Sequence, residues 1–162
     1  SPSRLPKYNY GPDFDKGFIT EHPPTPVAGQ EYPLQLPVVD GDGNDIAGIR
    51  TPEIQAPVGT HTGWSLRKDG VAKGDFFSLT GSFVPFARTK EERKASHDPR
   101  LSIEERYSSH NDYISAIEDA TKKLVADKLL LQEDAGRYIE AAKKRNPLDP
   151  NIPLLPLTLN NG

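Results

Sequence analysis

Hydrophobic positions change their spacing halfway along the chain. Between about residues 32 and 86, short apolar runs and alternating apolar positions are interrupted by glycine, proline and aspartate. After residue 89, apolar residues recur every three or four positions, which places them on one face of a helix. The pattern predicts an α+β chain, in which short β-hairpins and edge strands at about 32–86 precede a helical half at about 89–145.

The clearest strand signal flanks an acidic turn at residues 40–45, which reads Asp-Gly-Asp-Gly-Asn-Asp. The alternating apolar residues before the turn are Leu34, Leu36 and Val38, and an apolar run at 46–49 follows it. Because glycine and asparagine accept the positive φ that tight turns need, this pattern predicts a hairpin. Further short strands are expected at 54–58, 64–66 and 76–86. Prolines among these strands would remove ladder hydrogen bonds, which favours edge strands.

Helix-start signals appear in the second half of the chain. Thr89 and Ser102 each precede a glutamate by three positions, a capping-box spacing that satisfies donors at a helix end. A long helix is expected to begin near Ser109. The apolar face of this helix consists of Tyr113, Ile114, Ile117, Ala120, Thr121, Leu124 and Val125. A second helix is expected at 133–145, where basic residues lie near the negative end of the helix dipole.

Prolines concentrate near the two ends and disfavour helix there, because proline lacks the amide donor. The chain is therefore predicted to be a single segment with an extended strap, a β-rich part, a helical part and an extended tail. These parts are residues 1–30, 31–88, 89–146 and 147–162. The apolar tail is expected either to dock as an extended segment or to extend freely. The chain contains no methionine, so Ser1 is expected to be an internal or processed start.

Composition limits the classes of function. The chain has 162 residues, of which 35% are hydrophobic, and a net charge of -3; this indicates one domain whose core is modest or is shared with another segment. The basic residues are scattered, whereas nucleic-acid binding needs clustered lysine and arginine. No apolar run approaches the roughly 18 residues of a membrane span. Cysteine is absent, which excludes disulfides and thiolate ligands. We expect a soluble chain with no nucleic-acid or membrane partner.

The acidic turn raises the question of a calcium site. Asp40, Asp42 and Asn44 match the first three oxygen ligands of an EF-hand loop. However, Asp45 stands where that loop needs glycine, and Thr51 stands where it needs the bidentate glutamate. We therefore predict a hairpin turn without a metal, and ion binding at this turn is the alternative.

The segment from His61 to Arg67 resembles part of a serine nucleophile elbow. In Gly-Trp-Ser-Leu-Arg, however, Arg67 replaces the second glycine of the elbow motif and no helical pattern follows, so Ser65 is not predicted to be catalytic. Loops that contain glycine, an aromatic residue and arginine do line pockets. His61, Trp64 and Arg67 are therefore candidate substrate-binding residues. The alternative for Trp64 is packing in a core or an interface.

Several segments, taken in order, resemble one protein family. They are Tyr10-Gly11-Pro12, Gly17-Phe18-Ile19, Pro23-Pro24, the stretch 37–50 with its acidic turn, Thr62 to Arg67, Gly81 to Thr89, Asp98 to Arg100 and Ser102 to Tyr107. Their succession resembles the C-terminal region of the bacterial "alpha/beta hydrolase domain" family, whose large members look like serine esterases. The resemblance covers roughly residues 8–145 and depends on the order of the motifs.

The resemblance implies a role without local catalysis. In that family the nucleophilic serine and the catalytic histidine lie upstream of the matched part, so no catalytic residue is carried over, and His61 stands where an aromatic residue is common. The implied function is a C-terminal portion of a carboxylic ester hydrolase that packs on the catalytic core and borders the substrate cleft. The implied partners are the rest of the hydrolase, in the same or a companion chain, and a small ester substrate, with no cofactor; a secreted or periplasmic location is compatible with the family. The alternative is a standalone non-catalytic binding or structural module.

Overall fold

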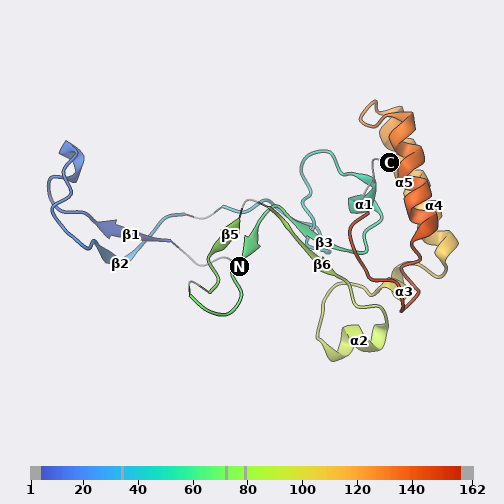
Figure 1. Ribbon diagram of the computed structural model, residues 1–162, viewed down its shortest axis with the longest axis horizontal. Helices are drawn as coiled ribbons and strands as arrows, with labels where there is room; N and C mark the ends of the chain where they lie inside the picture. The colour runs from blue at the N-terminus through green and yellow to red at the C-terminus, as the bar shows by residue number, and fades with distance from the viewer. Residues whose placement is uncertain (1–4, 34, 72, 79, 158–162) are drawn as a thin grey trace. The chain divides into compact units, whose positions relative to one another are not determined.

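The computed structural model describes residues 5–33, 35–71, 73–78 and 80–157. The chain divides into two compact units, which are described separately (Figure 1). One unit comprises Ser1–Leu36 and Leu66–Phe77, and the other comprises Pro37–Ser65 and Ser78–Gly162. We call them the hairpin unit and the core unit. Together they contain short antiparallel strands and helices, which confirms the predicted α+β class.

The hairpin unit begins with two antiparallel strands, β1 (Pro6–Asn9) and β2 (Thr25–Glu31). The connection between them contains a short 3-10 helix, η1 (Phe14–Lys16), against which the ring of Tyr10 stacks at 4.6 Å from Phe14. The lead-in, which its prolines predict to be extended, thus folds back into a hairpin. Proline is tolerated here because a two-stranded sheet consists only of edge strands.

A second two-stranded sheet joins β4 (Ser65–Leu66) to β5 (Phe76–Ser78). Next to this sheet, the backbone N–H of Arg67 donates to the carbonyl of Asp75 at 2.8 Å, and the guanidinium of Arg67 lies 5.4 Å from the centre of the Phe77 ring. None of the described residues of the hairpin unit is buried. These strands therefore form without an enclosed apolar core of their own.

The strands of the core unit are β3 (Gly59–Thr62) and β6 (Ser82–Pro85), which pair antiparallel with His61 opposite Phe83. The predicted strand at 54–58 is wrong, because the chain forms a short helix, α1 (Pro52–Gln55), at its start. Pro52 occupies the first turn of this helix, where its fixed φ suits the helical conformation and its missing N–H costs nothing. Proline thus begins a helix where the sequence pattern indicates an edge strand.

Four more helices follow in the core unit. They are α2 (Lys90–Ala95), α3 (Ile103–Arg106), α4 (His110–Ala126) and α5 (Gln132–Lys144). The predicted starts are confirmed: Thr89 caps α2 through a complete capping box, and the hydroxyl of Ser109 accepts a hydrogen bond from the N–H of Asp112. At α3, the carboxylate of Glu105 accepts from the N–H of Ser102 at 3.1 Å and from its hydroxyl at 2.8 Å. No described helix combines the length and apolar character that crossing a membrane requires.

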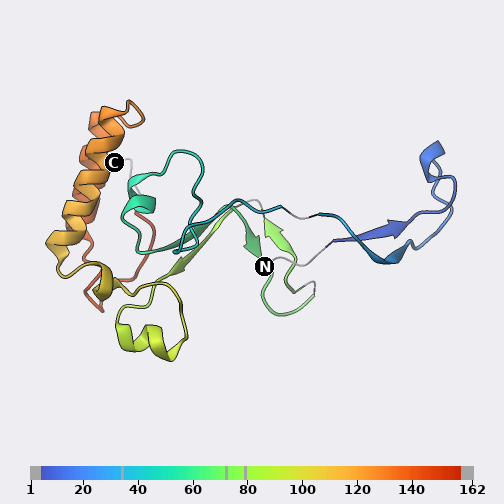
Figure 2. The ribbon, with the colours of Figure 1, turned by 180° about the vertical axis from the view of Figure 1, so that it is seen from behind.

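The core lies where α4 and α5 pack side by side, as both ribbon views show (Figure 2), and where α1 contacts α4. Its buried residues are Ala56, Val58, Phe86, Ile103, Tyr107, Tyr113, Ile117, Tyr138, Ala142 and Leu157. Leu157 belongs to the tail, whose described residues, 147–157, therefore dock on the core. The guanidinium of Arg88 holds the tail by donating to the carbonyls of Pro147, Asp149 and Ile152.

Candidate functional site

The acidic turn is a compact hairpin turn, as the sequence predicts. The Oδ1 of Asp40 accepts hydrogen bonds from the backbone N–H of Asp42 at 2.9 Å and of Asn44 at 3.0 Å. Gly43 has a φ of 78°, the left-handed conformation that glycine adopts readily. Among the described residues on either side, the predicted strands are reduced to one bridge, between Val39 and Asp45, and Leu34 lies outside the described residues. Both side-chain and backbone hydrogen bonds therefore hold the turn.

Arginine side chains neutralise the two carboxylates at the centre of this turn. Arg50 pairs with Asp40, with 2.6 Å between Nη2 and Oδ2, and Arg106 pairs with Asp42. Burial raises the pKa of Asp40, but the hydrogen bonds from Arg50 and from two backbone amides outweigh it and leave this pKa below its ordinary value. Among the described residues, no three histidine, aspartate or glutamate side chains gather in a way that could hold a metal ion. Guanidinium groups occupy the carboxylates that a calcium ion would use.

Asn44 fastens the turn to strand β3. Its side chain is fully buried; its Oδ1 accepts from the backbone N–H of His61 at 2.7 Å, and its Nδ2 donates to the carbonyl of Gly59 at 3.4 Å. The imidazole of His61 contacts the ring of Phe83, with the ring centres 5.0 Å apart. Burial lowers the pKa of His61, against a smaller opposing effect of Glu53, and so favours the neutral imidazole.

His61 lines a small hollow of about 260 Å³ in the core unit. The other lining residues are Asp45, Ala47, Ile49, Arg50, Ile54, Thr62 and Gly63. Trp64 lies just beyond this set, where its carbonyl accepts a hydrogen bond from the hydroxyl of Thr62 at 2.6 Å. Arg67 is exposed and belongs to the hairpin unit. A substrate-binding surface that includes all three residues therefore stays a prediction.

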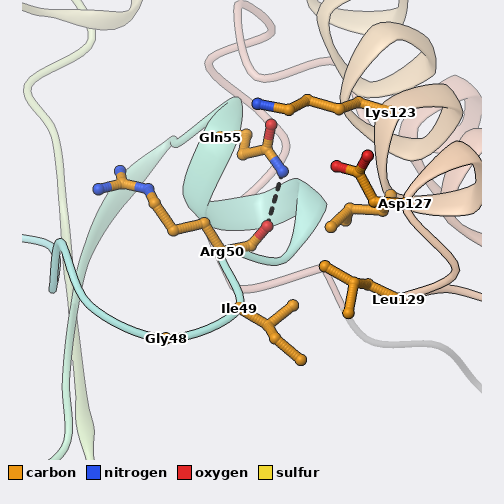
Figure 3. Close-up of a pocket in the computed structure, with 8 residues that line it drawn as sticks. Gly48, Ile49, Arg50, Gln55, Lys123, Asp127 and Leu129 are labelled. Atoms are coloured by element: carbon orange, nitrogen blue, oxygen red, sulfur yellow. Dashed lines mark hydrogen bonds between the residues drawn. The ribbon is translucent and has the colours of Figure 1, made fainter.

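A larger hollow of about 520 Å³ lies in the core unit between α4 and the loop that precedes α1 (Figure 3). Its lining residues are Gly48, Ile49, Arg50, Gln55, Lys123, Leu124, Asp127 and Leu129. The sequence does not reveal this hollow, because Lys123 falls on the polar face of α4 and looks like any solvated lysine. The only sequence signal is Asp127, an oppositely charged residue four positions after Lys123.

The polar side chains that line this larger hollow differ in whether they form hydrogen bonds or ion pairs. The amide nitrogen of Gln55 donates to the carbonyl of Arg50 at 2.6 Å, and the guanidinium of Arg50 is directed away from the hollow (Figure 3). The side chains of Lys123 and Asp127 make no hydrogen bond or ion pair with any residue that the structure describes. Both reach toward the wall that carries Gln55 (Figure 3). The lining residues include no hydroxyl, thiol or imidazole group, so the hollow lacks the side chains of a serine or cysteine hydrolase nucleophile and its histidine base.

Comparison with known proteins places the chain in a family. No significant match was found among curated proteins, and none was found among solved structures. The model of the family described as Alpha/beta hydrolase domain matches residues 16–140. The match includes the acidic turn, both hollows and most of the two long helices. This match spans well over half of the sequence and agrees with the resemblance that the order of the motifs indicates. The chain therefore belongs to the Alpha/beta hydrolase domain family.

Proposed function

We propose that this chain is the C-terminal portion of a carboxylic ester hydrolase and packs on the catalytic core of that enzyme. Membership of the Alpha/beta hydrolase domain family supports a hydrolase. In this proposal the nucleophilic serine and the catalytic histidine belong to the core. The serine is acylated by the ester and then deacylated by water, while backbone amides stabilise the oxyanion.

The observation that carries the packing role is the exposed apolar surface of the hairpin unit. Its large exposed apolar residues are Leu5, Tyr8, Phe14, Phe18, Ile19, Tyr32, Leu36, Val71, Phe76 and Phe77. A two-stranded hairpin is at best marginally stable alone in water, and contiguous exposed apolar surface usually marks a contact with another protein surface. A hydrolase core that covers these residues would supply the burial that the hairpin unit lacks.

The partners of the acidic and histidine side chains in the core unit also support a non-catalytic role. The carboxylates of Asp40 and Asp42 are paired with Arg50 and Arg106. The imidazole of His110 is bonded to the carbonyl of Ala142 at 2.9 Å. His61 contacts an aromatic ring and is surrounded by a partly apolar environment. These side chains stabilise the fold, which fits a part that shapes a cleft rather than one that transfers protons.

We further propose that His61, Trp64 and Arg67 border the substrate cleft of the whole hydrolase. The small hollow lined by His61, Thr62 and Gly63 supports this role for His61. A residue that borders the cleft should change the KM for an ester more than it changes kcat, because it contacts the substrate away from the reacting atoms. Arg67→Gln tests this effect, and the matched control is Lys94→Gln, a substitution at an exposed position of α2.

The test of the proposed function is an assay of the chain alone and in combination. With p-nitrophenyl butyrate, the chain alone should release no more nitrophenol than heat-denatured chain. A family hydrolase that lacks its counterpart of residues 16–140 should bind this chain and gain activity. Robust turnover of any kind by the chain alone would contradict the proposal, and turnover that persists in the Ser65→Ala and His61→Ala variants would require another nucleophile.

A second candidate function is a standalone, non-catalytic binding module. The enclosed core around Ile117 and the larger hollow favour it, since both lie within one unit of the chain. The two candidates differ in what covers the apolar residues of the hairpin unit. If the chain packs on a hydrolase core, the free chain should bind the dye ANS and lose that binding when the core is added. A module complete in itself should bind little dye under either condition.

A further inference from the structure

Lys123 and Asp127 are charged residues of the larger hollow whose side chains lack an ion pair with any described residue, unlike Arg50, which lines the same hollow. Several other carboxylates in this unit accept from an arginine, including Asp40, Asp42 and Asp98. Lys123 and Asp127 have no such partner among the described residues, although they lie one helical turn apart. Both line the hollow of Figure 3. Two opposite and unpaired charges therefore face the same concave surface.

The position of Asp127 adds to this contrast. It is the C-terminal cap of α4, where the helix dipole is negative and disfavours a carboxylate. In addition, a lysine that precedes an acidic residue by four positions pairs less favourably than the reverse order. The end of the helix therefore favours Lys123 but gives the carboxylate of Asp127 no favourable partner. A ligand that carries a positive group would supply one to Asp127.

The other wall of the hollow is apolar. Ile49 and Leu129 are 59% and 49% exposed, while Leu124 is buried beneath them. In Figure 3, Ile49 and Leu129 lie together at the end opposite Lys123. The volume of about 520 Å³ lies within the range of small-molecule sites. The hollow therefore combines a polar end that carries both charges with an apolar end.

We propose that this hollow binds a small zwitterion with an aliphatic chain, of the class represented by leucine. The ammonium group would pair with Asp127, the carboxylate with Lys123, and the aliphatic chain would cover Ile49 and Leu129. A ligand with a single charge would leave one of the two side chains unpaired. Arg50 adds no free charge, because its guanidinium is bonded to Asp40 and to two backbone carbonyls.

This binding involves no bond formation and needs no hydrolase core. It therefore goes beyond the proposed function, and either proposal can fail while the other holds. Because the two charged side chains are exposed, each ion pair contributes little and the dissociation constant should be about 1 mM or weaker. Nuclear magnetic resonance detects binding of this strength.

The test is a titration of the isotope-labelled chain with L-leucine, followed through backbone amide shifts. Saturable shifts are expected at Gly48, Ile49, Gln55 and residues 123–129. The probes 4-methylpentanoate, 3-methylbutylamine and glycine lack the ammonium, the carboxylate and the aliphatic chain, respectively. Each should bind at least threefold more weakly than leucine. Absence of saturable shifts, or equal binding of the single-charge probes, would overturn the proposal.

Variants that remove one charge test the two proposed ion pairs individually, Lys123 with the ligand carboxylate and Asp127 with the ligand ammonium. Lys123→Gln should weaken leucine binding at least threefold and remove the preference for leucine over 3-methylbutylamine. Asp127→Asn should do the same for the preference over 4-methylpentanoate. The control is Lys122→Gln, a neighbouring exposed lysine that does not line this hollow. Circular dichroism checks that each variant folds, and unchanged leucine binding in both hollow variants would refute the assignment.

Discussion

The two units of this chain use their apolar residues in opposite ways. In the core unit, Ile103 and Ile117 are completely buried, and the tail contributes Leu157 to the same cluster. In the hairpin unit, Phe18 and Val71 are 66% and 92% exposed, and none of the described residues is buried. The core unit thus encloses a buried apolar cluster, whereas the described residues of the hairpin unit enclose none.

Because of this difference, the two units must be stabilised in different ways. Two long helices bury one face each against the other and against the turn-containing segments, so stability comes from within the core unit. The two-stranded sheets of the hairpin unit have two edges and little to pack against within that unit. The proposed hydrolase core would complete the hairpin unit, whereas the core unit is already complete. Matched substitutions in the two units test the distinction.

The largest expected difference follows from truncating one apolar side chain in each unit. Ile117→Ala leaves a cavity under α4 and should lower the free energy of unfolding by about 2–5 kcal/mol. Phe18→Ala removes a side chain that is 66% exposed and should change it by less than about 0.5 kcal/mol. Urea unfolding followed by circular dichroism at the helix band measures both. Equal losses would mean that Phe18 contributes to a core that the isolated chain already encloses.

A pair of glycine substitutions sharpens the comparison, because both introduce a steric clash. A Cβ at Gly59 would lie 2.5 Å from Cε2 of Phe83 and 2.8 Å from the carbonyl oxygen of Val84. Gly59→Ala should therefore destabilise the core unit by about 1–3 kcal/mol. A Cβ at Gly11 would lie 1.8 Å from Oγ1 of Thr20, at a φ of 99° that suits only glycine.

Gly11→Ala should distort the hairpin unit without moving the helical transition. Amide shifts near Thr20 should change, while the urea midpoint of the helices stays at its wild-type value. A lower midpoint in Gly11→Ala would show that the two units unfold together and would break the distinction between them.

Sequence reasoning succeeds for elements whose signals are local. The caps at Thr89 and Ser109, and the helical spacing that follows Ser109, predict α2 and α4 because a helix satisfies its own backbone and its caps are encoded within four residues. The acidic turn is predicted for the same reason, since the Oδ1 of Asp40 accepts its two backbone hydrogen bonds from within the turn. These features need no knowledge of the rest of the fold.

Predictions fail where distant segments decide the structure. Proline in a β-rich stretch indicates an edge strand, yet Pro52 begins α1, which contacts α4. The side chains that neutralise the acidic turn are Arg50 and Arg106, and the latter lies 64 positions from Asp42. The larger hollow likewise exists only because the loop at Gly48 lies against the end of α4. Sequence spacing carries no information on such contacts.

A smaller effect is expected from replacing the residue that precedes a helix in each unit. Ser109→Ala removes the acceptor for the N–H of Asp112 at the start of α4 and should cost about 1 kcal/mol. Asp13 precedes η1 in the hairpin unit but makes no capping hydrogen bond. Asp13→Ala should therefore leave the thermal midpoint nearly unchanged, while Ser109→Ala lowers it. If both variants lowered the thermal midpoint equally, the hairpin unit would contribute to stability as much as the core unit does, contrary to this prediction.

The smallest expected effect is a pH dependence that only the core unit should show. Hydrogen bonds from Arg93 and from the N–H and hydroxyl of Ser102 lower the pKa of Glu105 from 4.5 to about 2. A carboxyl whose pKa is depressed in the folded state stabilises that state above its unfolded pKa, and loses this contribution as the pH falls toward its folded pKa. Arg93→Gln removes the strongest of these hydrogen bonds, so its urea midpoint should lie below that of wild type near neutral pH. The gap should close as the pH falls from about 4.5 toward about 2.

The matched variant in the hairpin unit is Lys16→Gln, which removes the ion pair with Asp13. That pair is well exposed, with side-chain exposures of 73% and 42%, so water screens it. The urea midpoint of this variant should follow that of wild type at every pH. A gap for Arg93→Gln that stays constant with pH would mean that Arg93 acts through packing rather than through the charge of Glu105. A pH-dependent gap for Lys16→Gln would mean that charges of the hairpin unit contribute to the stability of the core unit.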